Sequence, residues 1–253
     1  ANIQIQSLIA STLDIQNAAY LANQYAFEKQ LGSNPGSILN ETSIQVADKG
    51  FIALLSDHQI ENKGVLIANL GSVVLGVGEK QTLTFDNGLI NLAIDKPVFE
   101  ALEDSIHNQG LIQADGGKIL LTSKTLKETL SALVNNEGIV RANRAIEVNG
   151  VIEFISDGSI KSSGSANASN GSVHLKARQD VLVEGQYKAK GGAITMEAGH
   201  DLIVTGPTAT EGGMAFKAVN DIKVNADVTT DSGNLSFLTD VDRDGVGAFL
   251  QSP

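Results

Sequence analysis

The last third of the chain repeats with a period near 20 residues, and this period limits what the chain can fold into. Four glycines are each followed, nine residues later, by an aspartate. The aspartates are Asp180, Asp201, Asp221 and Asp242, so successive repeats are 21, 20 and 21 residues apart. A short period that keeps its register over several copies is typical of a solenoid.

Within each repeat, apolar residues alternate with polar ones. Val173 and Leu175 are separated by His174, for example, and the equivalent positions of the next repeats are Ile194 and Met196. This alternation predicts a strand with one face in the core and one in water. A second short strand follows Asp180, Asp201 and Asp221, which leaves no room for a helix. We therefore predict an all-β fold, a right-handed parallel β-helix with coils of about 20–21 residues.

The middle of the chain has the same character but carries insertions. Residues 62–68 match residues 108–114 at a shift of 46, and residues 136–142 give a third copy 28 further on. These shifts exceed one coil. The insert at 79–104 predicts an extra-helical hairpin that turns at Asn87 and Gly88.

Three further stretches interrupt the repeats. Residues 123–133 carry Leu126, Leu130 and Leu133 at helical spacing, which predicts a short helix capped by Ser123 or Thr125. Residues 16–31 are expected to be partly helical. The run at 156–171 is rich in Ser, Gly and Asn and predicts a loop. We accordingly divide one continuous solenoid into an interrupted part, 1–155, and regular shaft repeats, 156–253.

One segment near the beginning resembles a known family. It consists of Ser7, Leu8, Ile9, Ala10, Ser11, Thr12, Leu13, Asp14 and Ile15. It is similar to a segment of the secretion domains of two-partner secretion exoproteins, the filamentous-haemagglutinin-like family. Supporting stretches follow in the family's order, at 36–40, 49–55, 60–64, 71–75, 82–85, 110–117 and 134–136. The resemblance covers roughly residues 1–155.

The resemblance implies a secreted bacterial adhesin without enzymatic activity. Export through the periplasm to the cell surface would use an outer-membrane β-barrel transporter, and the ligand would be a host-cell or surface receptor or glycan. In the family, an Asn-Pro-Asn-Gly motif and an N-terminal cap precede this segment. Here Asn34 and Pro35 lie after it, so we expect this chain to lack its N-terminal cap.

Two other functions share the same scaffold. A β-helix polysaccharide lyase or hydrolase would place acidic residues on one sheet face, often with Ca²⁺. The N-terminal shaft of a contact-dependent growth-inhibition toxin would have the same visible repeats. Neither a nucleophile elbow nor a phosphate-binding loop is present in the sequence.

Composition excludes several classes of partner. The chain has 18 Lys and Arg against 29 Asp and Glu, a net charge of −11. This charge repels phosphate backbones, so nucleic acid is not expected as a partner. There is no cysteine, which rules out disulfides and thiolate zinc sites. No apolar run is long enough to cross a bilayer, so no direct membrane insertion is expected.

The polar residues of the repeats suggest three kinds of site. The column of Asp180, Asp201, Asp221 and Asp242 predicts corner turns in which each carboxylate accepts a backbone N–H of its own coil. The second set is Asn62, Asn108 and Asn136, each two residues before a glycine. These asparagines could form an amide ladder, and ordinary turn chemistry is the interpretation we favour.

The third candidate is a calcium loop. Asp240, Asp242 and Asp244, followed by Gly245, match the first half of a calcium-binding loop. Position 12 is Gln251 instead of the bidentate glutamate, and no flanking helices are predicted. We therefore expect no cofactor, with a weak Ca²⁺ site as the alternative to a solvated acidic turn.

Overall fold

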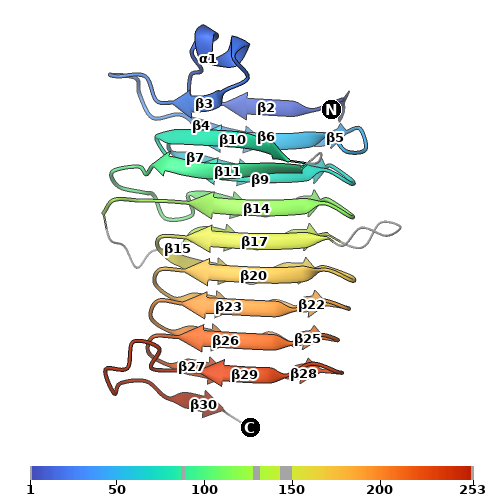
Figure 1. The fold of residues 1–253 in the computed structure, drawn as a ribbon, viewed down its shortest axis with the longest axis vertical. Helices are drawn as coiled ribbons and strands as arrows, with labels where there is room; N and C mark the ends of the chain where they lie inside the picture. Colours follow the sequence, from blue (N-terminus) through green and yellow to red (C-terminus); the bar gives the residue numbers. More distant parts are fainter. Residues whose placement is uncertain (1, 87–88, 128–131, 143–149, 252–253) are drawn as a thin grey trace.

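The chain forms an elongated right-handed parallel β-helix in the computed structural model, which describes residues 2–86, 89–127, 132–142 and 150–251. Each coil contributes one strand to each of three nine-stranded sheets, and the coils stack in sequence order from one end to the other (Figure 1). The predicted fold class is confirmed.

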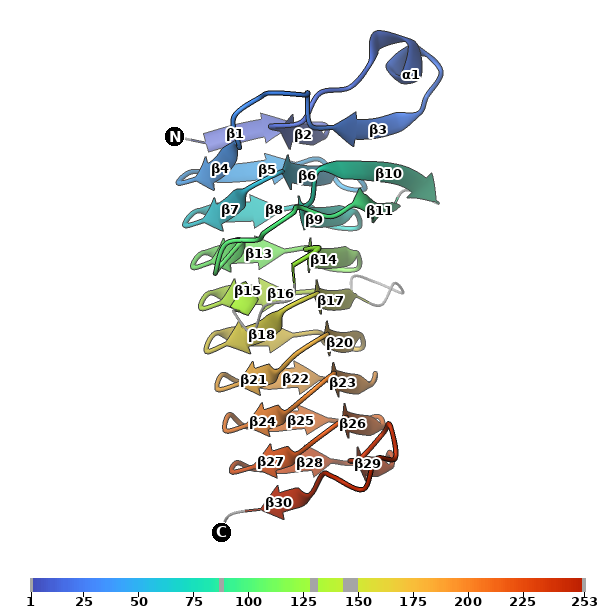
Figure 2. The same cartoon turned by 90° about the vertical axis from the view of Figure 1, so that its left-hand side faces the viewer.

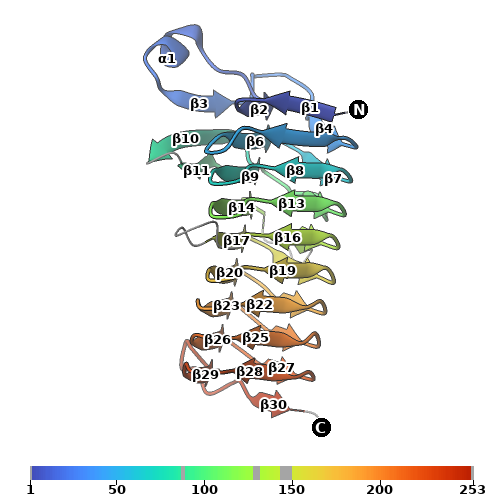
Figure 3. The ribbon, with the colours of Figure 1, turned by 90° about the vertical axis from the view of Figure 1, so that its right-hand side faces the viewer.

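The three sheets, called A, B and C here, form the faces of the solenoid (Figures 2 and 3). Sheet A contains β1 (Asn2–Ile5), β5 (Ser43–Val46), β8 (Val65–Ile67), β13 (Leu111–Gln113), β16 (Ile139–Arg141), β19 (Ser165–Asn167), β22 (Tyr187–Ala189), β25 (Thr208–Thr210) and β28 (Val228–Thr230). Sheet B contains β2 (Leu8–Ser11), β6 (Phe51–Ser56), β9 (Ser72–Val77), β14 (Lys118–Ser123), β17 (Val151–Ser156), β20 (Ser172–Ala177), β23 (Ile194–Ala198), β26 (Met214–Ala218) and β29 (Leu235–Leu238). Sheet C contains β4 (Ser37–Asn40), β7 (Gln59–Asn62), β12 (Ile106–Asn108), β15 (Ala132–Asn136), β18 (Ser159–Ser162), β21 (Val181–Val183), β24 (Leu202–Val204), β27 (Ile222–Val224) and β30 (Phe249–Gln251).

Alternate residues of each strand fill the interior. In sheet B, Val73 pairs in register with Ile119, Ile119 with Ile152, and Ile152 with Val173, and all four are fully buried. Like side chains therefore stack along the axis, one strand spacing apart. Since each layer is buried only by its neighbours, the array folds as a whole.

Glycine columns form two corners of the coil. At the corner between sheets A and B, an added Cβ on Gly192 would overlap the carbonyl oxygen of Gly171. At the corner between sheets C and A, a Cβ on Gly110 would overlap the carbonyl oxygen of Gly64 in the same way. Because the backbones approach this closely, only glycine fits these positions. This requirement explains why a glycine opens each repeat.

A fourth, smaller sheet lies outside the solenoid on sheet B. It contains β10 (Lys80–Asp86), paired antiparallel with β11 (Leu89–Lys96) and with β3 (Tyr25–Glu28). The predicted hairpin in the 79–104 insert is thus confirmed, although its turn residues, 87–88, lie outside the described part of the chain. The sheet buries an apolar cluster against β6, β9 and β14. The cluster comprises Leu13, Phe27, Ala53, Leu55, Val74, Leu83, Ile90 and Leu120.

Gln81 anchors this hairpin to the solenoid. Its side chain is fully buried, and its amide nitrogen donates to the carbonyl oxygens of Ser56, Gly76 and Gly78 at 2.9, 3.2 and 3.0 Å. A side chain at Gly76 would collide with Leu92 and with Gln81 itself. Gly76 in β9 and Gly78 just after it therefore leave space for the hairpin.

Three local predictions have mixed outcomes. The expectation for 16–31 is confirmed by the short helix α1 (Asn17–Leu21). The helix predicted at 123–133 is wrong wherever the chain is described: Ser123 ends β14, and Leu133 is buried within β15. Residues 128–131 of that prediction lie outside the described residues. Here the pairing of β15 with β12 and β18 overrides the helical spacing of the leucines.

The loop predicted at 156–171 is also wrong, because this stretch forms β18 and β19, and so completes a regular coil. Ser159 and Ser162 are buried in β18, and Ala166 is buried in β19. Small residues serve here as interior side chains, whereas their composition is typical of a loop.

Candidate functional sites at the first coil and the corners

The segment that carries the resemblance forms the first rung of sheet B. Residues Leu8–Ser11 are β2, which pairs in parallel with β6. The hydroxyl of Ser7 accepts the backbone N–H of Phe51 at 3.2 Å, and that of Ser11 accepts the N–H of Leu13 at 3.0 Å. Asp14 then exchanges backbone hydrogen bonds with Glu28 of β3, at 3.0 and 2.8 Å. The segment therefore joins the solenoid to its outer sheet.

A buried carboxylate fixes the path of the chain after β2. Asp57 accepts from the Thr12 hydroxyl at 3.0 Å and from the Gly36 backbone at 2.9 Å. Lys29 pairs with it at 2.8 Å, and only 2% of the Asp57 side chain is exposed. Burial raises the pKa of Asp57, but the hydrogen bonds from Lys29, Gly36 and Thr12 together outweigh it and lower the pKa. Asp57 therefore holds together residues 12 and 36, the two ends of the segment that leaves the solenoid after β2, and Lys29 from within that segment pairs with it.

An aromatic groove lies beside this first rung. It has a volume of about 500 Å³ and is lined by outward residues of β2 together with Ile15, Tyr20, Tyr25, Phe27 and Phe51. The ring of Phe85 packs on Tyr25 and Phe51, with centroids 4.9 and 5.3 Å apart. Tyr20 is 57% exposed and Phe85 46% exposed. This is an apolar surface with hydroxyl groups at its rim.

A buried amide ladder runs inside the corner between sheets C and A. The Asn40 amide donates to Asn62 at 2.7 Å, Asn62 to Asn108 at 2.7 Å, and Asn108 to Asn136 at 2.8 Å. Asn136 then donates to the Ser162 hydroxyl at 3.2 Å. The three predicted asparagines are fully buried. Our preference for ordinary turn chemistry is therefore wrong, because these amides bond to one another between coils.

The aspartate column bonds between coils as well. Asp180 accepts the backbone N–H of Asp201 at 2.9 Å, and Asp201 accepts that of Asp221 at 3.1 Å. The predicted bonds within one coil are thus replaced by bonds to the next coil. Lys223 adds salt bridges to Asp201 and Asp221, at 3.1 and 3.2 Å. Like charges are tolerated here because each carboxylate is bonded to an N–H or a cation.

Asp242 does not belong to this column, which corrects the prediction. Ala248 takes its place, and its backbone N–H donates to Asp221 at 3.0 Å. The reason is an inserted loop, residues 239–248, between β29 and β30. The nine-residue spacing from Gly233 to Asp242 therefore matches the repeats only by coincidence, because Asp242 lies in this loop.

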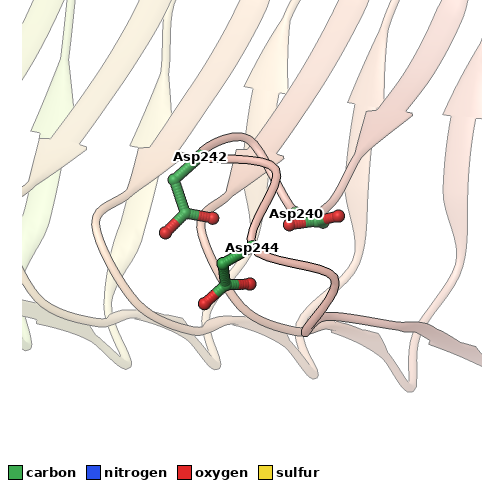
Figure 4. A group of neighbouring side chains, drawn as sticks. All are labelled: Asp240, Asp242 and Asp244. Carbon is green, nitrogen blue, oxygen red and sulfur yellow. The ribbon is translucent and has the colours of Figure 1, made fainter.

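The three carboxylates of the calcium candidate converge in that loop. One carboxylate oxygen each from Asp240, Asp242 and Asp244 lies within 4.8 Å of the other two. Figure 4 shows the three side chains on this loop. Asp240 and Asp244 also accept backbone N–H groups of Gly245 and Val246, at 3.1 and 2.8 Å. The loop is exposed at Asp242 and Asp244. Calcium binding stays a prediction, and calorimetric titration with Ca²⁺ is the measurement that decides it.

Sequence reasoning missed Asn40, Asp57 and Gln81. Asn40 precedes Thr42, so it lacks the glycine that marks the other ladder residues. Asp57 and Gln81 each bond across more than 20 residues of sequence, for which no local pattern exists. Among the described residues, no helix is long and apolar enough to cross a membrane.

Together these features define a class of protein: a right-handed parallel β-helix with an antiparallel sheet on one flank and bonded polar columns at its corners. No family model matches the chain, and no curated protein matches it. The fold is shared with the crystal structure of the HMW1 secretion domain from Haemophilus influenzae. The two agree with a TM-score of 0.71 at 18% sequence identity, over 94% of this chain and 76% of that one.

Proposed function

We propose that this chain is a secreted bacterial exoprotein of the two-partner secretion type, exported through an outer-membrane β-barrel transporter to the cell surface. The observation that carries the proposal is the agreement in fold with a secretion domain along 94% of the chain. The segment 7–15 gives independent support, since it resembles the secretion segment of the filamentous-haemagglutinin-like exoproteins and forms the first rung of sheet B.

We propose that the segment 7–15 is part of the surface that the transporter recognises. Ile9 is a half-buried, outward-facing residue of β2 beside the aromatic groove. Ile203 of β24 is also half-buried and outward-facing, but it lies in the regular repeats. The pair offers a matched comparison of the same side chain at two places on the solenoid.

The experiment measures secretion of the chain, behind a signal peptide, from a Gram-negative host that co-expresses an outer-membrane transporter of the two-partner secretion type. We expect the unaltered chain and Ile203→Ser to reach the medium, and Ile9→Ser to stay in the periplasm. Circular dichroism and limited proteolysis of the purified variants check that each is folded. Equal secretion of the two variants would overturn the role of the segment, and equal release with and without the transporter would overturn the proposed export route.

An adhesive role follows as the second half of the proposal. Acidic groups on the outer face of sheet B are paired with lysines: Glu153 with Lys118 at 2.7 Å, and Glu197 with Lys217 at 3.1 Å. Such pairing suits a structural surface better than general acid–base catalysis. Binding of the labelled chain to host cells or to a glycan array tests adhesion. Cleavage of uronate polymers that disappears in Asp242→Ala would favour the lyase or hydrolase alternative.

A further inference from the structure

We infer that the buried amide ladder sets the register between coils that are joined by long connections. The ladder residues are separated by 22, 46, 28 and 26 residues from Asn40 to Ser162. In the regular repeats the corresponding positions are Val183, Val204 and Val224, and the coils there are 21 and 20 residues apart. Polar residues thus fill this column where the spacing varies, and valine fills it where the spacing is constant.

The connections that lead into sheet C differ in the same way. Long connections, residues 12–36, 78–105 and 124–131, precede β4, β12 and β15, whose last residues are Asn40, Asn108 and Asn136. The other two ladder strands, β7 and β18, follow two-residue connections at 57–58 and 157–158, but each pairs with a strand that follows a long connection. The regular strands β21, β24 and β27 follow connections of three residues each, at 178–180, 199–201 and 219–221. After the last long connection, at 239–248, the column returns to an amide, Gln251, which pairs with Val224 and lies exposed at the end of the solenoid.

A short connection restricts register by its length, whereas a long one allows a strand to slide. A shift by one residue is excluded by alternation, because it would turn the apolar face outward. A shift by two residues keeps every inward position inward. Apolar side chains therefore discriminate poorly against it. In the regular repeats, such a shift would simply place Val183 opposite Leu202 in place of Val204.

The asparagines remove this ambiguity. In the native register, Asn62 lies opposite Asn108. A shift by two residues would place its amide opposite Ile106, which is fully buried and has no polar side-chain atom. A buried amide without partners is strongly unfavourable. One hydrogen-bonded polar column thus gives the interrupted coils a specificity that their connections do not supply, as a buried asparagine does in coiled coils.

Disulfide trapping tests the inference, because the chain contains no cysteine. Val65 and Leu111 are register partners that lie on the outer face of sheet A, just after the ladder corner. The pair Val65→Cys with Leu111→Cys reports the native register. The pair Val65→Cys with Gln113→Cys reports a two-residue slip. Each pair is denatured, reduced, refolded under oxidising conditions and mapped by mass spectrometry without reduction.

In the otherwise unaltered chain we expect only the native pair to close. In the fourfold variant Asn40→Val, Asn62→Val, Asn108→Val and Asn136→Val we expect the slipped pair to close as well, with loss of the single product. Closure of the native pair alone in this variant would overturn the inference. If the fourfold variant does not refold, Asn62→Val with Asn108→Val replaces it, since Val183, the register partner of Ser162, shows that valine fits the column; the same two outcomes decide.

A destabilising control separates register from general stability. Val204→Ala creates a cavity in the same column but in the regular repeats, where Val204 is fully buried. We expect this variant to unfold at lower urea concentration and still to close only the native pair. Slipped cross-links in Val204→Ala would show that any loss of stability permits slipping, and would overturn the assignment to the ladder.

Discussion

The two parts of the solenoid share one cross-section but establish it by different means. From β18 to β29 the coils follow each other at nearly constant spacing, and short turns with bonded aspartates join sheets B and C. Before β18 the chain leaves the solenoid repeatedly, and a buried amide ladder, an outer sheet and the Asp57–Lys29 pair bring it back. The comparison teaches that a constant period is sufficient for stacking but not required, provided that other contacts restore the register.

The glycine columns are common to both parts, and breaking them has the largest expected effect. We expect Gly192→Ala in the regular repeats and Gly117→Ala in the interrupted part each to lower the free energy of unfolding by ~3–5 kcal/mol, because the new Cβ overlaps a carbonyl oxygen of the preceding coil. Urea denaturation followed by circular dichroism measures the loss. Gly213→Ala is the control, since its nearest neighbour would lie at 3.6 Å. A comparable loss in the control would contradict the explanation.

The outer sheet belongs to the interrupted part alone, so loosening it should leave the regular repeats unchanged. Gln81→Leu removes three hydrogen bonds to buried carbonyls, and we expect a local loss of ~2–3 kcal/mol. Hydrogen exchange should accelerate in β10 and β11 and stay unaltered in β23 and β26. Thr84→Val, at an exposed position of β10, serves as the control. Uniform acceleration along the whole solenoid would show that the two parts unfold as one unit.

The corners between sheets A and B show how the two parts differ in local strain. The residue before the column glycine has positive φ in both: Lys49 (66°), Leu70 (56°) and Gly116 (70°) in the interrupted part, and Asn170 (54°) and Gly191 (76°) in the regular part. Asparagine and glycine tolerate this conformation better than lysine does. We expect Lys49→Gly to raise the free energy of unfolding by ~0.5–1 kcal/mol and Asn170→Gly to change it by a few tenths at most. Thermal unfolding measures both, and a loss in Lys49→Gly would refute the strain argument.

The regular repeats could be predicted from the sequence because their inward residues, Val173 and its equivalents, recur at a constant distance. Their faces, strand order and stacking all follow from that recurrence. The hairpin at 80–96 was predictable from its turn signal and alternation. Asp242 shows the limit of the method: it kept the period of the repeat while its loop left the solenoid, and only the pairing of β30 with β27 reveals this.

The sites were less predictable than the fold, because they depend on long-range pairing. Asn62 and Asn108 are 46 residues apart in sequence, and only the stacked coils bring their amides to 2.7 Å. The helix predicted at 123–133 was wrong because residues 132–136 form β15 and pair with β12 and β18, which the local spacing of the leucines does not reveal. Composition alone did not show that Ser162 and its neighbours line a core.

The smallest expected effect concerns the charged corner of the regular repeats. His200 lies 2.8 Å from Asp180 and 3.9 Å from Asp201. The hydrogen bond that the His200 ring donates to Asp180 raises the pKa of His200, burial lowers it, and the carboxylates of Asp180 and Asp201 raise it further. A raised pKa in the folded state means that the protonated pair stabilises the fold below pH ~6.5, and that this contribution is lost as the pH rises through the folded-state pKa.

Because the His200 side chain is 52% exposed, solvent screening limits the contribution to a few tenths of a kcal/mol. We expect His200→Gln to be less stable than the unaltered chain at pH 5.5 and equal to it at pH 8.5 in urea unfolding. The pKa of Asp201 is lowered, so its own titration falls at more acidic pH and does not overlap this window. His174→Gln is the control in the neighbouring sheet. A pH-independent difference for His200→Gln would mean that the side chain stabilises the corner by packing instead of by charge.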